Sequence, residues 1–128
     1  MIFNQDENLP KVVVNTNPNY ETLNRLAEMI RYDNANKGFT VTIGNIEQKL
    51  LLVVSEICEA QDELRDGHDL NEVYYGDLNK PLGFPIEIAD AIIRLLDICG
   101  AFGIDIERVI DEKLAYNRSR LPKHGRRF

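Results

Sequence analysis

The sequence predicts an all-α domain in which four helices form one bundle. Apolar residues recur at helical spacing in four separate segments, whereas the alternation typical of strands is confined to one short stretch. One long connection separates the second helical segment from the third, as in bundles that contain a crossover. At 128 residues the chain has the length of a single domain, so we expect residues 1–128 to fold as one unit.

The first helix is expected to follow Asn17, a suitable cap, with Pro18 at the first helical position. Its apolar face is defined by Leu23, Leu26, Ala27 and Ile30. Gly38 is expected to end this helix. Residues 1–16 have no sustained period and are expected to form an N-terminal arm.

Residues 39–43 alternate apolar side chains with threonine, but the run is too short to outweigh the helical pattern around it. We therefore expect a connector there. The second helix is expected from about Asn45 to Asp66, with Gly67 after its last turn. Its broad apolar face contains Leu50, Leu51, Val53, Val54, Ile57, Cys58 and Leu64.

Residues 67–84 contain three glycines and are expected to form the long connection. Pro85 suits the first turn of a third helix that reaches about Phe102. Asp105 is expected to cap a fourth helix that ends near Ser119.

The charge balance restricts the class of ligand. A net charge of -6 and a pI near 4.9 disfavour a nucleic acid polymer, whereas a small phosphorylated ligand can bring its own divalent cation. The chain has neither a secretion signal at its start nor an apolar run of membrane-spanning length, so we expect a cytoplasmic protein without a membrane partner. Residues 121–128 form a basic tail, and Cys58 and Cys99 are expected to be buried and reduced.

Charged residues occupy one narrow stripe of the expected third helix. They are Glu87, Asp90, Arg94 and Asp97, and they fall within roughly 80° of the helical wheel. Nearly all other residues of this helix are apolar, so most of its circumference is expected to be buried. The stripe then faces either a thin strip of water or an internal polar site.

The second helix carries a matching ridge, because Glu56, Glu59 and Glu63 lie within roughly 60° of one another, away from its apolar face. Such like charges repel one another unless something positive lies among them. Two acidic ridges that face each other would offer the carboxylate oxygens that Mg²⁺ prefers. The expected ligands of Mg²⁺, or of Mn²⁺ in its place, are Glu56, Glu59, Glu87 and Asp90. The alternative is that the glutamates form an ordinary solvated face.

The fourth helix adds positive charge, since Lys113 and Asn117 lie beside its apolar residues and Arg120 follows one turn later. A cation next to a metal-held triphosphate would neutralise the charge that develops on the leaving pyrophosphate. The alternative is that Lys113 and Arg120 extend from the edge of the core and complement the end of the helix.

The motif Glu56-x-x-Glu59, followed after 27 residues by Glu87-x-x-Asp90, resembles the signature of the MazG-like all-α nucleoside triphosphate pyrophosphohydrolases, which include dCTP and dUTP pyrophosphatases. The later run Lys113-x-x-x-Asn117-x-x-Arg120 is similar to that family's lysine-asparagine-arginine segment.

This resemblance implies a MazG-like helical bundle that forms a homodimer or homotetramer and hydrolyses a nucleoside triphosphate to the monophosphate and pyrophosphate, clearing non-standard or excess nucleotides. It implies Mg²⁺ on the four acids, with Lys113, Asn117 and Arg120 near the phosphates or the sugar. Water would attack the α-phosphorus, and either Glu59 or Glu63 would serve as general base.

Two features of this chain depart from the family pattern. Ser55 precedes Glu56 where many members have paired glutamates, and no tryptophan is available to recognise a base. The candidates for stacking on a nucleobase are Tyr20, Phe39, Tyr74, Tyr75 and Phe84, with ordinary packing as the alternative for each.

Two other functions are compatible with the pattern. One is a pyrophosphatase for a specialised substrate such as phosphoribosyl-ATP, and the other is a helical oligomer that binds a nucleotide or a protein partner without turnover. A di-iron bundle is excluded, because it needs Glu-x-x-His pairs on two helices, and His68 and His124 lie outside the expected helices.

Overall fold

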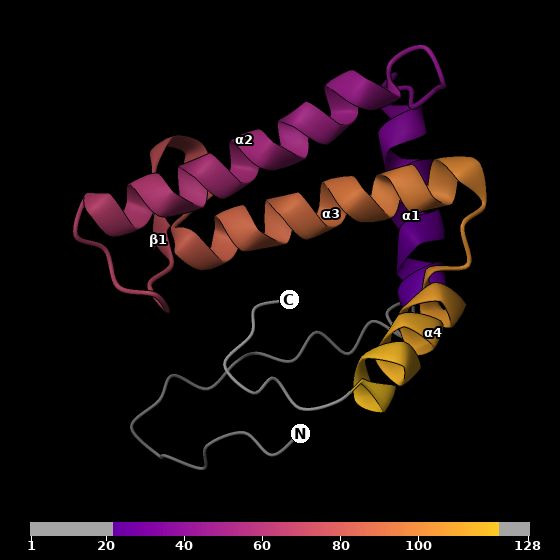
Figure 1. Ribbon diagram of the computed structural model, residues 1–128. Helices are drawn as coiled ribbons and strands as arrows, with labels where there is room; N and C mark the ends of the chain where they lie inside the picture. Colours follow the sequence, from indigo (N-terminus) through magenta and orange to yellow (C-terminus); the bar gives the residue numbers. More distant parts are fainter. Residues whose placement is uncertain (1–21, 121–128) are drawn as a thin grey trace.

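The computed structural model describes residues 22–120, and within them the chain is mostly helical, which confirms the all-α prediction (Figure 1). The helices of this part are α1 (Leu23–Asn36), α2 (Ile46–Arg65), α3 (Phe84–Phe102) and α4 (Ile106–Ser119). A small antiparallel hairpin between α2 and α3 pairs β1 (Tyr74–Tyr75) with β2 (Pro81–Leu82) around a 3₁₀ turn, Asp77–Asn79. The expected cap Asn17, the arm 1–16 and the tail 121–128 lie outside the described residues.

Helix α3 is the centre of the arrangement (Figure 1). Helix α2 runs antiparallel beside it, and α1 crosses the C-terminal half of α3. Helix α4 packs on α1, at the end of the molecule opposite the hairpin. The hairpin therefore lies where α2 ends and α3 begins.

Local capping chemistry explains the helix boundaries. Helix α1 begins at Leu23, where the side chain of Thr22 caps it by accepting a hydrogen bond from the backbone of Arg25 at 3.0 Å. Pro18, the expected first helical residue, lies outside the described residues. Asp105 caps α4 in the same way, as predicted. The predicted bounds of α2 and α3 agree with the structure to within one or two residues.

The core is small, and one cluster of it lies where α1 crosses α3. This cluster is formed by Ala27, Leu96 and Cys99, with partly buried neighbours that include Leu26 and Ile30. The other buried apolar residues of the described chain, on α2 and α3, are Val53, Ala60 and Ala91. The helices approach closely because α3 has Gly100 at the crossing, where an added Cβ would lie 2.7 Å from the Ala27 carbonyl oxygen. No helix within residues 22–120 combines the length and apolar character needed to cross a lipid bilayer.

Much of the apolar surface of α2 and α3 is exposed in the single chain. Large exposed side chains on these two helices include Leu50, Leu51, Val54, Ile57, Ile88, Ile92 and Leu95. The prediction that Cys58 is buried is wrong, because it lies on this exposed part of α2, whereas Cys99 is buried as expected. The apolar spacing predicted which faces of α2 and α3 are apolar, but α1 and α4 cover only part of these faces.

Candidate metal centre

Carboxylates of α2 and α3 meet on the facing sides of the antiparallel pair. Glu56, Glu87 and Asp90 each offer an oxygen, and these oxygens lie within 4.8 Å of one another. Glu56 is only 8% exposed, so the group is not an ordinary solvated face. The three-residue spacing in α3 puts both of its acids on the side that faces α2.

The surroundings of Glu87 disfavour its ionised form. Burial, and after it the contacts with Glu56 and Glu59, together raise the pKa of this carboxyl to about 7. Its Oε2 atom is buried and has no hydrogen-bond partner among the described residues. Ionised carboxylates only accept hydrogen bonds, so either a proton or a cation must lie between these oxygens.

Arg94 compensates part of this negative charge. Its Nε donates to Oε1 of Glu56 at 2.9 Å. Burial acts to raise the pKa of Glu56, but the hydrogen bonds that its carboxylate accepts from Arg94, and from the acidic neighbours Glu59 and Glu87, hold it below the ordinary value. Burial raises the pKa of Asp90, and the charge of Glu56 adds to this effect. Glu56 is therefore the member of the group that stays ionised most readily.

Glu59 lies beside this group but outside the set of closest oxygens. Its interaction with Glu56, and then its partial burial, raise the pKa of its carboxyl. Three of the four predicted ligands are thus brought together, and the fourth stands next to them in the same cleft.

Glu63 is engaged by the hairpin. The hydroxyl of Tyr74 donates to both carboxylate oxygens of Glu63, at 2.9 and 2.8 Å, and this contact raises the pKa of Tyr74 to about 12. The ring of His68 stacks on Tyr74 with 4.4 Å between centroids, and its Nε2 lies 3.7 Å from Glu63. Glu63 therefore ties α2 to the hairpin.

Two clefts meet at the acids. The first, of about 320 Å³, has apolar walls that include Phe39, Val41 and Ile93. The second, of about 450 Å³, is lined mainly by acids and by part of the hairpin. Both clefts include Glu56 and Asp90, so a ligand held by these two residues could extend to either side.

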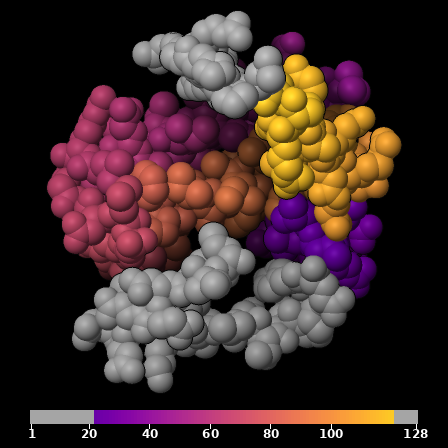
Figure 2. Space-filling model, turned by 60° about the horizontal axis from the view of Figure 1, so that its bottom comes forward, coloured from indigo at the N-terminus to yellow at the C-terminus, as the bar shows by residue number. Residues whose placement is uncertain are grey.

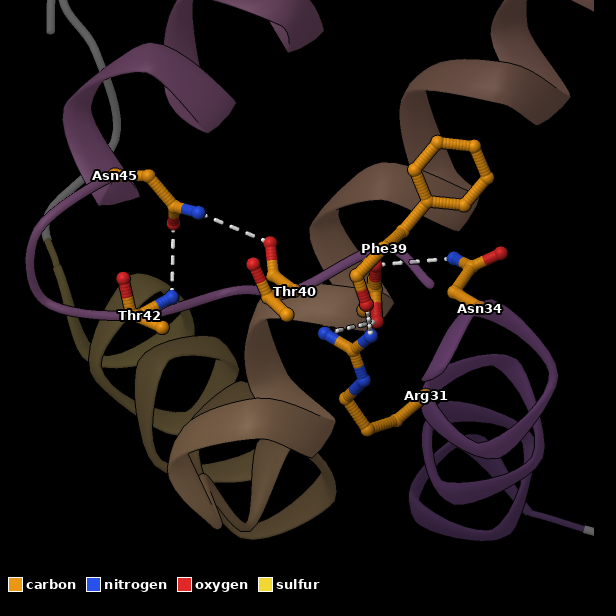
Figure 3. Close-up of polar contacts among 7 residues, drawn as sticks. Arg31, Asn34, Phe39, Thr40, Thr42 and Asn45 are labelled. Carbon is orange, nitrogen blue, oxygen red and sulfur yellow. Dashed lines mark hydrogen bonds and ion pairs between the residues drawn. The ribbon is translucent and has the colours of Figure 1, made fainter. Parts of the chain in front are cut away.

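Polar contacts hold the connector that supplies Phe39 (Figure 3). Arg31 donates to the carbonyl of Phe39 and lies 3.3 Å from the Asp97 carboxylate, which also accepts from Asn34 at 3.0 Å. Asn45 completes the connector by bonding the backbone of residues 40 and 42. Asp97, one of the stripe residues, thus helps to fix the wall of the first cleft.

The α4 residues lie elsewhere in the single chain. Figure 2 shows α4 against α1, at the opposite end from residues 60–80. The ammonium of Lys113 and the guanidinium of Arg120 lie 4.9 and 5.3 Å from the ring centroid of Tyr116. Neither of these side chains nor Asn117 lines either of the two clefts.

Lys80 is the residue of this region that the sequence did not suggest. It lies in the hairpin and lines the second cleft together with the acids. No helical period marks it, because its position depends on a turn whose conformation the sequence pattern does not reveal. Comparisons of the chain with models of protein families, with characterised proteins and with solved structures find no match.

Proposed function

We propose that this protein hydrolyses a nucleoside triphosphate to the monophosphate and pyrophosphate, with Mg²⁺ held between α2 and α3. The observation that carries the proposal is the meeting of Glu56, Glu87 and Asp90, whose oxygens lie within 4.8 Å of one another. The order of these acids along the chain, which resembles that of the MazG-like pyrophosphohydrolases, supports the choice of reaction.

The donor set suits Mg²⁺. Carboxylate oxygens are the ligands that this ion prefers, and those of Glu56, Glu87 and Asp90 lie close enough together to share one ion. The buried, unpartnered Oε2 of Glu87 would gain a partner on binding. Bound there, Mg²⁺ would neutralise phosphate charge and make water a better nucleophile near neutral pH.

Side chains around the acids would orient the carboxylates and accept a proton from the attacking water. Arg94 fixes one oxygen of Glu56, which leaves the other for the ion. The oxygen of water would bond to the α-phosphorus as the bond to the bridging oxygen breaks, and pyrophosphate would leave with that electron pair. We assign the water proton to Glu59, because its carboxylate is exposed in the cleft, whereas both oxygens of Glu63 accept from Tyr74. Glu63 is the alternative base.

The first cleft suits the nucleoside. Its apolar wall can contact a base and a sugar, and Phe39, which is 56% exposed, offers an aromatic face for stacking. Asp90 and Asp97 are seven residues apart on α3, about 10 Å along the helix axis, which is about the distance from an α-phosphate to the far edge of its base.

We also propose that the protein is a homo-oligomer. Many large apolar side chains of α2 and α3 are exposed in the single chain, and contiguous exposed apolar surface is typical of proteins that associate. In such an assembly, Lys113, Asn117 and Arg120 would reach the phosphates or the sugar at the acids of a neighbouring copy, because they do not line the clefts of their own chain.

The test is a substrate panel with Mg²⁺ or Mn²⁺, containing ribo- and deoxynucleoside triphosphates and phosphoribosyl-ATP. We expect pyrophosphate and not orthophosphate as product. Asp90→Asn should abolish turnover, whereas Asp62→Asn, which changes another acid lining the second cleft, should retain it. Release of orthophosphate would contradict the proposal. Turnover of phosphoribosyl-ATP alone would identify the specialised pyrophosphatase. Nucleotide binding without turnover would favour the non-catalytic alternative.

A further inference from the structure

Glu56 and Asp90 line two clefts whose other lining residues differ in character. The first cleft has an apolar part, formed by Phe39, Val41, Ile93 and Ile98, beside polar and charged residues of both signs. The second cleft is lined by acids and hairpin residues, and Leu82 is its one large aliphatic side chain among the described residues. A nucleoside triphosphate cleaved between its α- and β-phosphates has the same asymmetry, with a nucleoside on one side of the scissile bond and pyrophosphate on the other. If the nucleoside lies in the first cleft, the pyrophosphate must lie in the second.

The second cleft holds little positive charge for such an anion. Among the described residues that line it, Lys80 is the one cation, and it stands opposite Glu56, Glu59, Asp62, Glu63, Glu87 and Asp90. Its charge acts on Asp90, whose pKa it lowers against the larger raising effect of burial. Yet no carboxylate of the described residues lies within 4.0 Å of its ammonium, so no ion pair with them occupies it.

The hairpin holds Lys80 at the end of a tight turn. Leu78 and Asn79 both adopt positive φ, 57° and 59°, as a type I′ hairpin turn requires. This conformation is common for asparagine but unfavourable for leucine. Leu78 is fully exposed, so burial of its side chain does not explain this conformation. The turn is closed by hydrogen bonds from Gly76 to the carbonyl of Lys80 at 2.9 Å and from Lys80 to that of Asp77 at 3.1 Å. Such strain is concentrated at functional sites, and the residue that this turn directs to the cleft is Lys80.

The base of the hairpin is equally constrained. Gly83 has φ +128°, and a Cβ at this position would lie 2.2 Å from the backbone oxygen of Glu72. On the other side, Tyr74 is bonded to Glu63 of α2. The hairpin therefore contacts both helices that supply the acids, through Tyr74 on α2 and through β2 on α3, and the backbone of Lys80 is held at a defined place relative to them.

We infer that Lys80 binds the pyrophosphate half of the substrate and neutralises the negative charge that it carries as it leaves. This inference rests on the proposed function, and it adds a residue of the hairpin to those expected near the phosphates. No covalent bond to Lys80 forms. The ammonium acts only through its charge and its hydrogen bonds.

The experiment measures the binding of inorganic pyrophosphate with Mg²⁺ to the full chain by calorimetry, and product inhibition by pyrophosphate and by the monophosphate. Lys80→Met should weaken pyrophosphate binding about tenfold, lower kcat/KM about 10- to 100-fold, and change inhibition by the monophosphate less than twofold. Lys80→Arg should restore most of the pyrophosphate binding. Lys49→Met is the matched control, because Lys49 lines the first cleft, and it should leave pyrophosphate binding unchanged.

Equal weakening by Lys80→Met and Lys49→Met would overturn the inference, since only the overall charge would then matter. Unchanged pyrophosphate binding in Lys80→Met would overturn it as well. Because Lys80 is exposed, we expect the thermal unfolding of the variant to match the wild type, which separates a loss of binding from a loss of folding. If the wild type turns over no triphosphate but binds pyrophosphate through Lys80, the proposed reaction fails while the anion site stands. If turnover occurs and Lys80→Met binds pyrophosphate normally, only this inference fails.

Discussion

Replacing Glu87 with glutamine should stabilise the metal-free protein and remove its response to Mg²⁺. In the folded protein the pKa of Glu87 is about 7, against an ordinary value of 4.5, because of burial and of the neighbouring Glu56 and Glu59. The folded state therefore binds this proton more tightly than the unfolded state does. Without metal, the contribution of Glu87 to the free energy of unfolding of the wild type should be highest at or below about pH 4.5. It should fall as the pH rises towards 7 and then level off.

The size of the effect follows from the same two values. The difference between 4.5 and about 7 corresponds to about 3 kcal/mol of stability lost across this pH range. Glutamine keeps the size of the side chain without the charge, so Glu87→Gln should unfold at pH 8 with a free energy about 1 to 3 kcal/mol higher than the wild type. The lower end of this range applies if Glu59 retains part of the shared proton.

Urea unfolding at several pH values between 5 and 8, in the presence of a chelator, measures this difference. Repeated with Mg²⁺ at about 100 times its dissociation constant, the wild type should gain about 2.7 kcal/mol and Glu87→Gln almost nothing. Asp62→Asn is the control and should behave as the wild type in both series. A variant that is clearly less stable than the wild type at pH 8 without metal would refute the reasoning, because Glu87 would then be making contacts that stabilise the fold.

Three further predictions concern the hairpin, the base and the assembly. Gly83→Ala should lower the free energy of unfolding by about 2 to 4 kcal/mol in urea denaturation, because its Cβ would collide with a backbone oxygen. Gly67→Ala, at φ +90° but with open space around it, should lower it by about 1 kcal/mol in the same assay. Equal losses would contradict this prediction. Glu59→Gln should lower kcat about 100-fold or more and Glu63→Gln less than tenfold in steady-state assays, and the reverse order would transfer the role of base to Glu63. Light scattering should give a mass above that of one 14.7 kDa chain, and mixing inactive Glu87→Gln with inactive Lys113→Met protein should restore part of the activity; a monomer, or no recovery in mixed oligomers, would rule out the shared site.

Helices α2, α3 and α4 could be predicted because their limits depend on local chemistry. Asp105 caps the first turn of α4 wherever the rest of the chain lies, and Pro85 fits the first turn of α3 for the same reason. The acids could be predicted because three- and four-residue spacings put them on one side of each helix. Their convergence then required only that a long connection return the chain antiparallel to α2.

The remaining features depend on contacts between distant parts of the chain. The hairpin was not predicted, because its two-residue strands exist only through pairing and through the contact of Tyr74 with Glu63. The exposure of Cys58 was not predicted either, since periodicity identifies an apolar face but not the element that covers it. For the same reason the sequence did not identify Lys80, which lines the second cleft only because of where its turn lies.

The features that build the candidate site are also those that weaken the isolated, metal-free chain. Glu87 is held near acids that raise its proton affinity, and the turn before Lys80 keeps two non-glycine residues at positive φ. The core offers little to offset this, because no large side chain among the described residues is less than 2% exposed. A ligand that binds only the folded state stabilises it, and the gain grows with the logarithm of the ligand concentration above its Kd. Mg²⁺ at the acids and a second copy on the exposed apolar face would therefore each raise the free energy of unfolding. Folding, metal binding and association should therefore be coupled in this protein, and a variant that abolishes one should measurably weaken the others.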